Sequence, residues 1–279
     1  MVLGRSSGTL SPPAAYVLYA KRVTTYQMQP RKGSVGASPS GKATDFDSVI
    51  RRFESSRPSQ PRFPPPRIGP FPMFTLYYAP NTCSLASHIA LEDAGAKYNL
   101  RRVDFGKAEQ QSPDYVAINP KARVPSMITP RGILTETPAM LAFIAQSFPE
   151  ARLAPIDDPF AFAEVQSVNS YLCSTVHVAH AHRMRGERWV DDPAAIVAMQ
   201  RKVPQSVGAC FELIERQMLK GPWVMGDNYT IADPYLFTLS QWLEGDGVDF
   251  SRIPRVIDHR SRMLERPNVK KAVAEELAA

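Results

Sequence analysis

Cysteine is scarce in this chain of 279 residues, and long apolar runs are missing from it. The few cysteines lie far apart and are odd in number, so they do not indicate the disulfide framework of a small secreted protein. They are Cys83, Cys173 and Cys210. This usage is typical of a reducing compartment, and we expect a cytoplasmic protein. No stretch reaches the roughly 18 to 20 apolar residues that a membrane-spanning helix needs, so we expect no membrane partner.

Acidic residues are rare in the first 72 residues. This segment holds 3 of the 27 acidic residues but 11 of the 33 lysines and arginines, so the formal net charge of +6 originates there. The rest of the chain carries 22 basic and 24 acidic residues. It offers no electrostatic reason for binding nucleic acid, and we expect no such partner.

The segment 1–72 also holds 11 of the 26 prolines. Its composition buries too little apolar surface to offset the entropy lost on ordering, so we expect a disordered tail with at most a brief helix over 45–53. It lacks the apolar core of a secretory signal. Three interpretations stay open: a transit peptide, a regulatory arm, and sequence upstream of a start at Met73. We favour the last, because Met73 directly precedes the first expected strand.

Residues 73–153 have the pattern of a compact α/β domain. Pro130 and Gly132, at the second and fourth positions of a turn, indicate a hairpin. Thr137 is the expected N-cap of the closing helix, with Pro138 as its first residue. The expected strands cover 74–79, 97–105, 124–128 and 132–136, and the expected helices cover 84–94 and 138–148. Strand, helix, strand, hairpin and helix form a thioredoxin-like order.

The pattern of residues 159–279 predicts an all-α domain. A linker near Pro155 precedes it. Two of its helices begin with an aspartate before a proline, because the acid caps the helix and proline suits its first position. The expected helix starts are Asp158–Pro159, Asp192–Pro193, Thr230, Pro254 and Pro267.

The segment YYAPNTCSLASHIALEDAG, residues 77–95, sets Cys83 at the start of a helix. Unpaired N–H groups and the helix dipole favour a thiolate at this point. Ala86 stands where a dithiol enzyme has its second cysteine, which excludes a CxxC redox cycle at this site. The alternative is that Cys83 is a small, half-buried residue.

Four segments in the right order are similar to motifs of one family. They are 77–95, INPKARVP at 118–125, LTETPAM at 134–140 and DNYTIADPYLF at 227–237. Together they resemble the cytosolic glutathione transferases, most of all the bacterial beta class, over about residues 73–279. The resemblance implies a glutathione-binding domain over 73–153, an all-helical domain over 159–279, glutathione as co-substrate and a homodimer. It does not extend to residues 1–72.

In this family the matching cysteine contacts the glutathione sulfur, so the resemblance gives Cys83 a catalytic and a binding role. Tyr78 and Ser84 are alternative donors to that sulfur, although an aromatic residue at a strand end more often serves packing. The resemblance also implies a cis bond between Val124 and Pro125, a bond type essentially confined to X-Pro. The backbone of Val124 would then pair with the cysteinyl part of glutathione. An ordinary trans proline is the alternative.

Glu136 and Thr137 match the residues that receive the γ-glutamyl end of glutathione. An acid meets its ammonium, while helix N-terminal amides and a hydroxyl meet its carboxylate. Lys107 is the implied cation for the glycine carboxylate, with a spacing one residue short, and Arg123 is a second candidate. Thr137 as a simple helix cap and Lys107 as a solvated surface lysine stay open.

Three histidines in VHVAHAH, residues 176–182, raise the question of a metal site. His177 and His180 share a helix face, whereas His182 does not. No acid or cysteine lies nearby at ligand spacing, so we expect no metal.

The resemblance gives His177 a catalytic role, because it faces the cysteine across the domain cleft and would stabilise a thiolate there by charge or by a hydrogen bond. Ser174 and Ser170 lie about one and two turns earlier, and Ser170 is an implied glutathione contact. Trp189 is a candidate for the acceptor pocket. Asp233 is interpreted as structural, since it closes a capping box with Thr230.

The predicted activity is conjugation of glutathione to small electrophiles, reduction of mixed disulfides or peroxides by glutathione, or both. A cysteine that bonds covalently to glutathione would suit reduction. The alternative is a non-catalytic interaction protein on the same fold, against which the set of Cys83, Val124–Pro125 and Glu136–Thr137 argues. The acceptor substrate is not predicted, because such pockets are built from scattered apolar residues.

Overall fold

The computed structural model describes residues 74–278. The brief helix expected over 45–53 and the start at Met73 lie outside the described residues. The chain splits into two units, and residues 74–278 belong to the second, Ile68–Ala279. None of the helices in the described part is long and apolar enough to cross a membrane.

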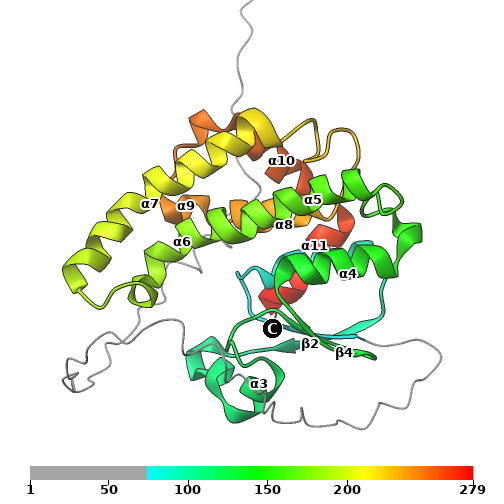
Figure 1. Ribbon diagram of the computed structural model, residues 1–279, viewed down its shortest axis with the longest axis horizontal. Coiled ribbons are helices and arrows are strands. Elements are labelled where there is room, and N and C mark those ends of the chain that lie inside the picture. The colour runs from blue at the N-terminus through cyan, green and yellow to red at the C-terminus, as the bar shows by residue number, and fades with distance from the viewer. Residues whose placement is uncertain (1–73, 279) are drawn as a thin grey trace, which may run out of the picture. The chain divides into compact units, whose positions relative to one another are not determined.

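A mixed four-stranded sheet forms the first half of this unit (Figure 1). The central strand β1 (Phe74–Tyr78) pairs in parallel with β2 (Tyr98–Arg102). On its other side it pairs antiparallel with β3 (Ser126–Thr129), which forms the predicted hairpin with β4 (Gly132–Thr135). Gly132, at φ 136, takes a backbone conformation that residues with a Cβ rarely adopt.

The two faces of the sheet are covered differently. Alternate side chains of β1, including Leu76 and Tyr78, join the main core, which α2 (Ser84–Asp93) and α4 (Thr137–Ser147) complete. The opposite face carries a smaller cluster, in which Tyr77 packs on Tyr115 with ring centroids 5.7 Å apart. Tyr115 belongs to the short helix α3 (Pro113–Ile118).

The second half is all helical, as the sequence predicts. Its helices are α5 (Pro159–Tyr171), α6 (His177–Met184), α7 (Pro193–Leu213), α8 (Ala232–Ser240), α9 (Leu243–Asp246), α10 (Pro254–Glu265) and α11 (Pro267–Ala278). A π-helical segment, Leu172–Val176, continues α5 into α6. Asp158 and Asp192 cap α5 and α7 as expected, since their carboxylates accept from backbone N–H groups of the first turn.

Helix α8 lies at the centre of the helical half, and every one of its residues is buried. The carboxylate of Asp233 accepts from the N–H of Thr230 at 2.7 Å, which confirms its structural reading. It also accepts from the N–H of Val224 at 2.8 Å and meets His259 Nε2 at 2.9 Å. Asp233 therefore ties together three segments of the helical half.

The two halves share one hydrophobic core. Helix α2 packs on α8 and α11, and α4 packs on α5. The N–H of Ile231 donates to the carbonyl of Leu153, which links the connection between the halves to α8. The domain limits at residues 153 and 159 stay predictions, because packing is continuous across them.

Candidate functional site

Cys83 lies where three segments of the chain meet. It follows β1 and forms the N-cap of α2. Its side chain is 9% exposed, and its thiol donates to the carbonyl of Val124 at 3.6 Å. The hydroxyl of Thr137, at the start of α4, hydrogen-bonds the sulfur from another side. The turn after β1, the turn before β3 and the first turn of α4 thus converge on one sulfur.

The turn before β3 contains the predicted cis peptide bond between Val124 and Pro125. Arg123 precedes this bond in the chain. Its carbonyl accepts from the hydroxyl of Tyr115 and from the side-chain amide of Asn119, both at 2.7 Å. Asn119 is 1% exposed and holds the turn through this buried hydrogen bond. The sequence prediction missed Tyr115 and Asn119, although Asn119 belongs to the INPKARVP motif.

Glu136 and Thr137 lie side by side at the junction of β4 and α4, but the expected cap is wrong. Glu136 is the N-cap of α4, at φ 74, and its side chain makes no capping bond. Thr137 is already the first helical residue, and it is buried. Its hydroxyl bonds Cys83 and does not cap the helix start. Lys121, which the prediction also missed, bonds the carboxylate of Glu136 and the hydroxyl of Thr135.

The thiol of Cys83 is not activated as the helix N-terminus alone predicts. Burial raises its pKa to about 11, and the thiol of Cys173 adds to the rise. Its hydrogen bond with Thr137 and the charge of Arg185 act in the opposite direction but do not outweigh burial. Cys83 is therefore a protonated thiol near neutral pH.

The two alternative donors to a bound sulfur lie in different surroundings. The hydroxyl of Ser84 donates to the carbonyl of Ala79 at 3.2 Å and shares a hydrogen bond with Thr82 at 2.7 Å. Tyr78 is buried beside His88, with ring centroids 6.3 Å apart. Burial and the nearby acids, Glu276 foremost, raise the pKa of Tyr78. Ser84 is thus engaged by its neighbours, whereas the role of Tyr78 toward a bound sulfur stays a prediction.

His177 lies in the helical half, and it does not supply a positive charge, which is one of the two ways in which the resemblance has it stabilise a thiolate. The other way, a hydrogen bond, stays a prediction. Burial lowers the pKa of His177 to about 3, and the neighbouring His180, Arg185 and Arg188 lower it further. Its imidazole is neutral near pH 7 and packs on Trp242, with ring centroids 5.1 Å apart. The cation that acts on Cys83 is Arg185, which the sequence prediction missed.

The other two histidines have structural partners. His180 stacks on Trp242 and meets both oxygens of Asp246 at 2.8 and 2.9 Å. His182 packs edge-on to Trp189 with ring centroids 4.4 Å apart. His177 and His180 thus share Trp242 as a packing partner, whereas His182 packs on Trp189.

One group of described residues could hold a metal ion by spacing alone. Ligand atoms of His88, Glu92 and Glu275 lie within 4.8 Å of one another. Lys271 already meets both oxygens of Glu92 at 2.8 and 2.9 Å, and the hydroxyl of Tyr98 donates to the same carboxylate. The group is satisfied as an ion-pair network between α2 and α11.

Lys107 and Ser170 as glutathione contacts, and Ser174 as a residue of the same cleft, are not tested by the geometry around Cys83. Lys107 is exposed, and its amino group lies 3.5 Å from Asp104. Ser170 and Ser174 are both exposed on the helix that leads to His177. Their roles toward glutathione stay predictions.

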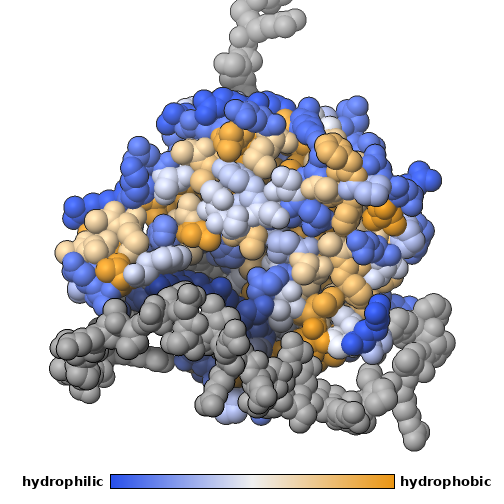
Figure 2. Space-filling view, viewed as in Figure 1, coloured by the Kyte–Doolittle hydropathy of each residue, from blue (hydrophilic) through white to orange (hydrophobic). Residues whose placement is uncertain are grey.

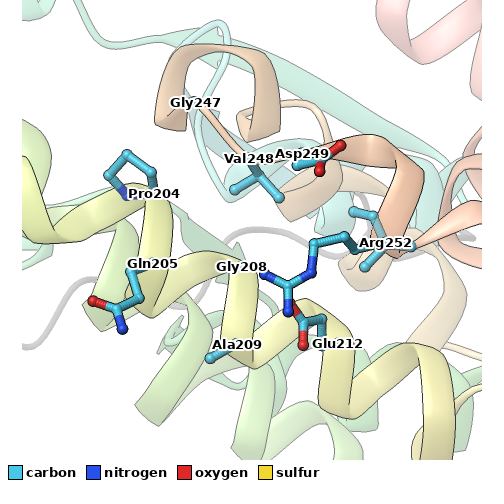
Figure 3. Close-up of a pocket in the computed structure, with 10 residues that line it drawn as sticks. Pro204, Gln205, Gly208, Ala209, Glu212, Gly247, Val248, Asp249 and Arg252 are labelled. Carbon is cyan, nitrogen blue, oxygen red and sulfur yellow. The ribbon is translucent and has the colours of Figure 1, made fainter.

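A separate pocket of about 410 Å³ lies between α7 and the loop after α9 (Figure 3). Arg252 reaches over it to Glu212, with which it forms an ion pair of 2.8 Å. None of the residues predicted for the glutathione site lines this pocket.

Comparison with known proteins decides the family. Residues 72–146 match the model of the glutathione S-transferase N-terminal domain, and residues 191–276 match that of a glutathione S-transferase C-terminal domain. The chain is also 31% identical to glutathione S-transferase GstA of Escherichia coli O157:H7, over 72% of this chain and 98% of that protein. This chain belongs to the glutathione S-transferase family.

Solved structures of the family agree with the fold. A glutathione transferase homologue from Sulfitobacter with bound glutathione is 45% identical, with a TM-score of 0.70, over 73% of this chain and 98% of that one. The beta-class glutathione S-transferase of Sphingomonas chungbukensis is 29% identical, with a TM-score of 0.64, over 72% of this chain and 98% of that one. The matched portion of this chain corresponds to nearly the whole length of these relatives.

Proposed function

We propose that this chain is a glutathione transferase that binds glutathione on its sheet half and joins it to a small electrophile. One observation carries the proposal: Cys83 contacts both the Val124 carbonyl and the Thr137 hydroxyl. The three segments that the family resemblance assigns to glutathione therefore meet at one sulfur. A non-catalytic protein would have no need to keep them together.

Glutathione would be recognised along its whole length. The backbone of Val124 would pair with its cysteinyl part, and the Cys83 thiol would then turn from that carbonyl to the ligand. The carboxylate of Glu136 would receive the γ-glutamyl ammonium, and the N-terminal amides of α4 would receive the α-carboxylate. Arg123 or Lys107 would meet the glycine carboxylate at the other end.

The raised pKa of Cys83 favours conjugation as the main reaction. A protonated thiol donates a hydrogen bond to the glutathione thiolate and leaves that sulfur free to attack. The attack forms a carbon–sulfur bond and expels the leaving group with its electron pair, while the proton of the glutathione thiol goes to solvent. Tyr78 and Ser84 have no comparable role in this scheme.

Reduction of disulfides is the second candidate, supported by the charge of Arg185, which acts to lower the pKa of Cys83. A thiolate at Cys83 would attack the glutathione sulfur of a glutathione-containing disulfide, which forms a mixed disulfide with glutathione and releases the other half as a thiolate. A second glutathione would release it as oxidised glutathione. A homodimer and a cytoplasmic location stay predictions.

The test compares the wild-type chain with Cys83→Ser and Cys83→Ala. We expect retention on immobilised glutathione and elution by free glutathione. We expect loss of about tenfold or more in conjugation for Cys83→Ala and a smaller loss for Cys83→Ser, which keeps a donor. If wild type is not retained at neutral pH, or if Cys83→Ala keeps full activity in both conjugation and disulfide reduction, the proposal is wrong.

A further inference from the structure

The turn between α6 and α7 carries two arginines to which the proposed function gives no contact with glutathione. Arg185 ends α6, and a single 3-10 turn, Gly186–Arg188, follows it. The N–H of Arg188 donates to the carbonyl of Arg185 at 3.0 Å. The two arginines are therefore three residues apart and joined by one turn of backbone, and the charge of Arg185 lowers the pKa of Arg188.

Close packing fixes this turn. Gly186 is buried, and a Cβ in its place would lie 3.0 Å from a methyl of Ile196 and 3.2 Å from the terminal carbon of Met199. Trp189, directly after the turn, packs on His182 yet stays 47% exposed. The arginines are therefore held by a packed turn, beside an aromatic surface that is open to solvent.

The charges of the two arginines are not neutralised. Within residues 74–278, neither guanidinium forms an ion pair or a hydrogen bond, and Glu187 attracts both only from a distance. Desolvation lowers the pKa of Arg185, and it lowers that of Arg188 to about 10. Repulsion from Arg123 acts on both. Partly desolvated cations that converge without an acid are suited to an anionic ligand, and paired guanidinium forks match a carboxylate.

The arginines also lie near the reacting centre. Arg185 interacts electrostatically with the thiol of Cys83, and both arginines act on His177. Arg123 approaches from the other half, since it precedes the Val124 whose carbonyl Cys83 contacts. In the proposed function, Arg123 or Lys107 serves the glycine carboxylate of glutathione, so Arg185 and Arg188 are left to face the acceptor.

We propose that Arg185 and Arg188 form a carboxylate-binding subsite for the acceptor, and that the favoured acceptors are small electrophiles with a carboxylate on a flat aromatic body. The ring would lie against Trp189, and the carboxylate would bridge the two guanidinium forks. The transfer reaction at this subsite rests on the proposed function, whereas carboxylate binding does not.

Binding alone tests the subsite, with 3,5-dinitrobenzoate and its methyl ester as unreactive probes in calorimetry on the full chain. We expect the acid to bind about tenfold or more tightly than the ester, as charge-assisted hydrogen bonds predict. Arg185→Gln with Arg188→Gln should abolish that preference. The matched control is Arg201→Gln on the exposed side of α7, which should keep it. Equal affinities of acid and ester for the wild-type chain would overturn the proposal.

Kinetics then separates the subsite from the glutathione site, with 4-chloro-3,5-dinitrobenzoate and its methyl ester as acceptors. Arg188→Gln alone, which leaves Arg185 beside Cys83, should lose about tenfold in kcat/KM for the acid and no more than about twofold for the ester, with an unchanged KM for glutathione. An equal loss for both acceptors, or a matching rise in the KM for glutathione, would overturn the subsite. Selective binding of the acid without conjugation of either acceptor would support the subsite and reject the proposed function.

Discussion

The two halves that meet at Cys83 build the site in different ways. The sheet half contributes mainly backbone and short motifs: the carbonyl of Val124, the start of α4 at Thr137, and the acid of Glu136. The helical half contributes long side chains from a single stretch of α6 and the turn after it, above all Arg185.

This difference suits two tasks. Backbone groups in fixed turns recognise a ligand that is always the same, and the proposed ligand of the sheet half is glutathione. Side chains on a helix end can be exchanged without loss of the fold, so the helical half can be adapted to different acceptors. Figure 2 shows apolar and hydrophilic side chains intermixed on one face of the molecule. Such a surface gives no simple sign of the acceptor.

The stability of the helical half depends on one buried acid, Asp233. Replacing this residue should have the largest effect of the variants that we predict. Asp233→Ala removes the acceptor of two buried N–H groups and the partner of His259. We expect a loss of about 3–5 kcal/mol in the free energy of unfolding, because buried polar groups are left unpaired. Urea unfolding followed by circular dichroism measures it.

The control for this variant is Asp258→Ala, which removes an exposed i,i+4 partner of Arg262. A surface pair of this kind contributes about 0.5 kcal/mol or less. Similar losses for the two variants would show that Asp233 does not organise the helical half.

The next largest effect should be seen in the rate at which the Cys83 thiol is alkylated when glutathione is left out. With a pKa of about 11, its thiolate fraction at pH 8 is a few hundredfold below that of an ordinary thiol with a pKa of about 8.5. Its alkylation by iodoacetamide, followed by peptide mapping, should be slow at pH 8 and rise steeply up to about pH 11. In urea it should react as an ordinary thiol, and fast alkylation in the folded chain would contradict this.

A variant of Glu136 tests the contribution of the sheet half separately from that of the helical half. Glu136→Gln keeps the shape of the side chain but removes the charge proposed to meet the γ-glutamyl ammonium. We expect the KM for glutathione to rise by about tenfold, with little change in the ratio of activities toward acidic and neutral acceptors. The matched control is Glu150→Gln, an exposed acid in the short turn after α4. If the acceptor ratio changes instead, the two halves do not divide the work as proposed.

The sequence was most informative where function depends on short stretches of the chain. The order of strands and helices along the sheet half and the helical second half follow from local patterns, whereas the cis bond before Pro125 was predicted from the family resemblance alone. The cap of α4 was predicted one residue too late, because the Thr137 hydroxyl serves Cys83 instead of the helix start.

The charge environment of Cys83 could not be predicted in the same way. Its thiol responds to burial by both halves and to Arg185, which lies about 100 residues away along the chain. A helix N-terminus favours a thiolate locally, but desolvation is a property of the whole fold and dominates here. The neutral state of His177 has the same origin, since it depends on burial and on cations gathered by the fold.

A variant of His177 should have the smallest effect, and it tests whether the fold keeps this histidine neutral. Its pKa is about 3 in the folded chain and near 6.5 when unfolded, so the unfolded state binds more protons between these values. The His177 contribution to stability is therefore fully present above about pH 6.5 and is lost as pH falls toward 3. His177→Leu should make unfolding free energy fall less steeply below pH 6.5 than in the wild-type chain, measured by urea unfolding at a series of pH values. His182→Leu, at an imidazole on the neighbouring turn, is the matched comparison, and equal slopes for wild type and His177→Leu would show that the helical half does not hold His177 neutral.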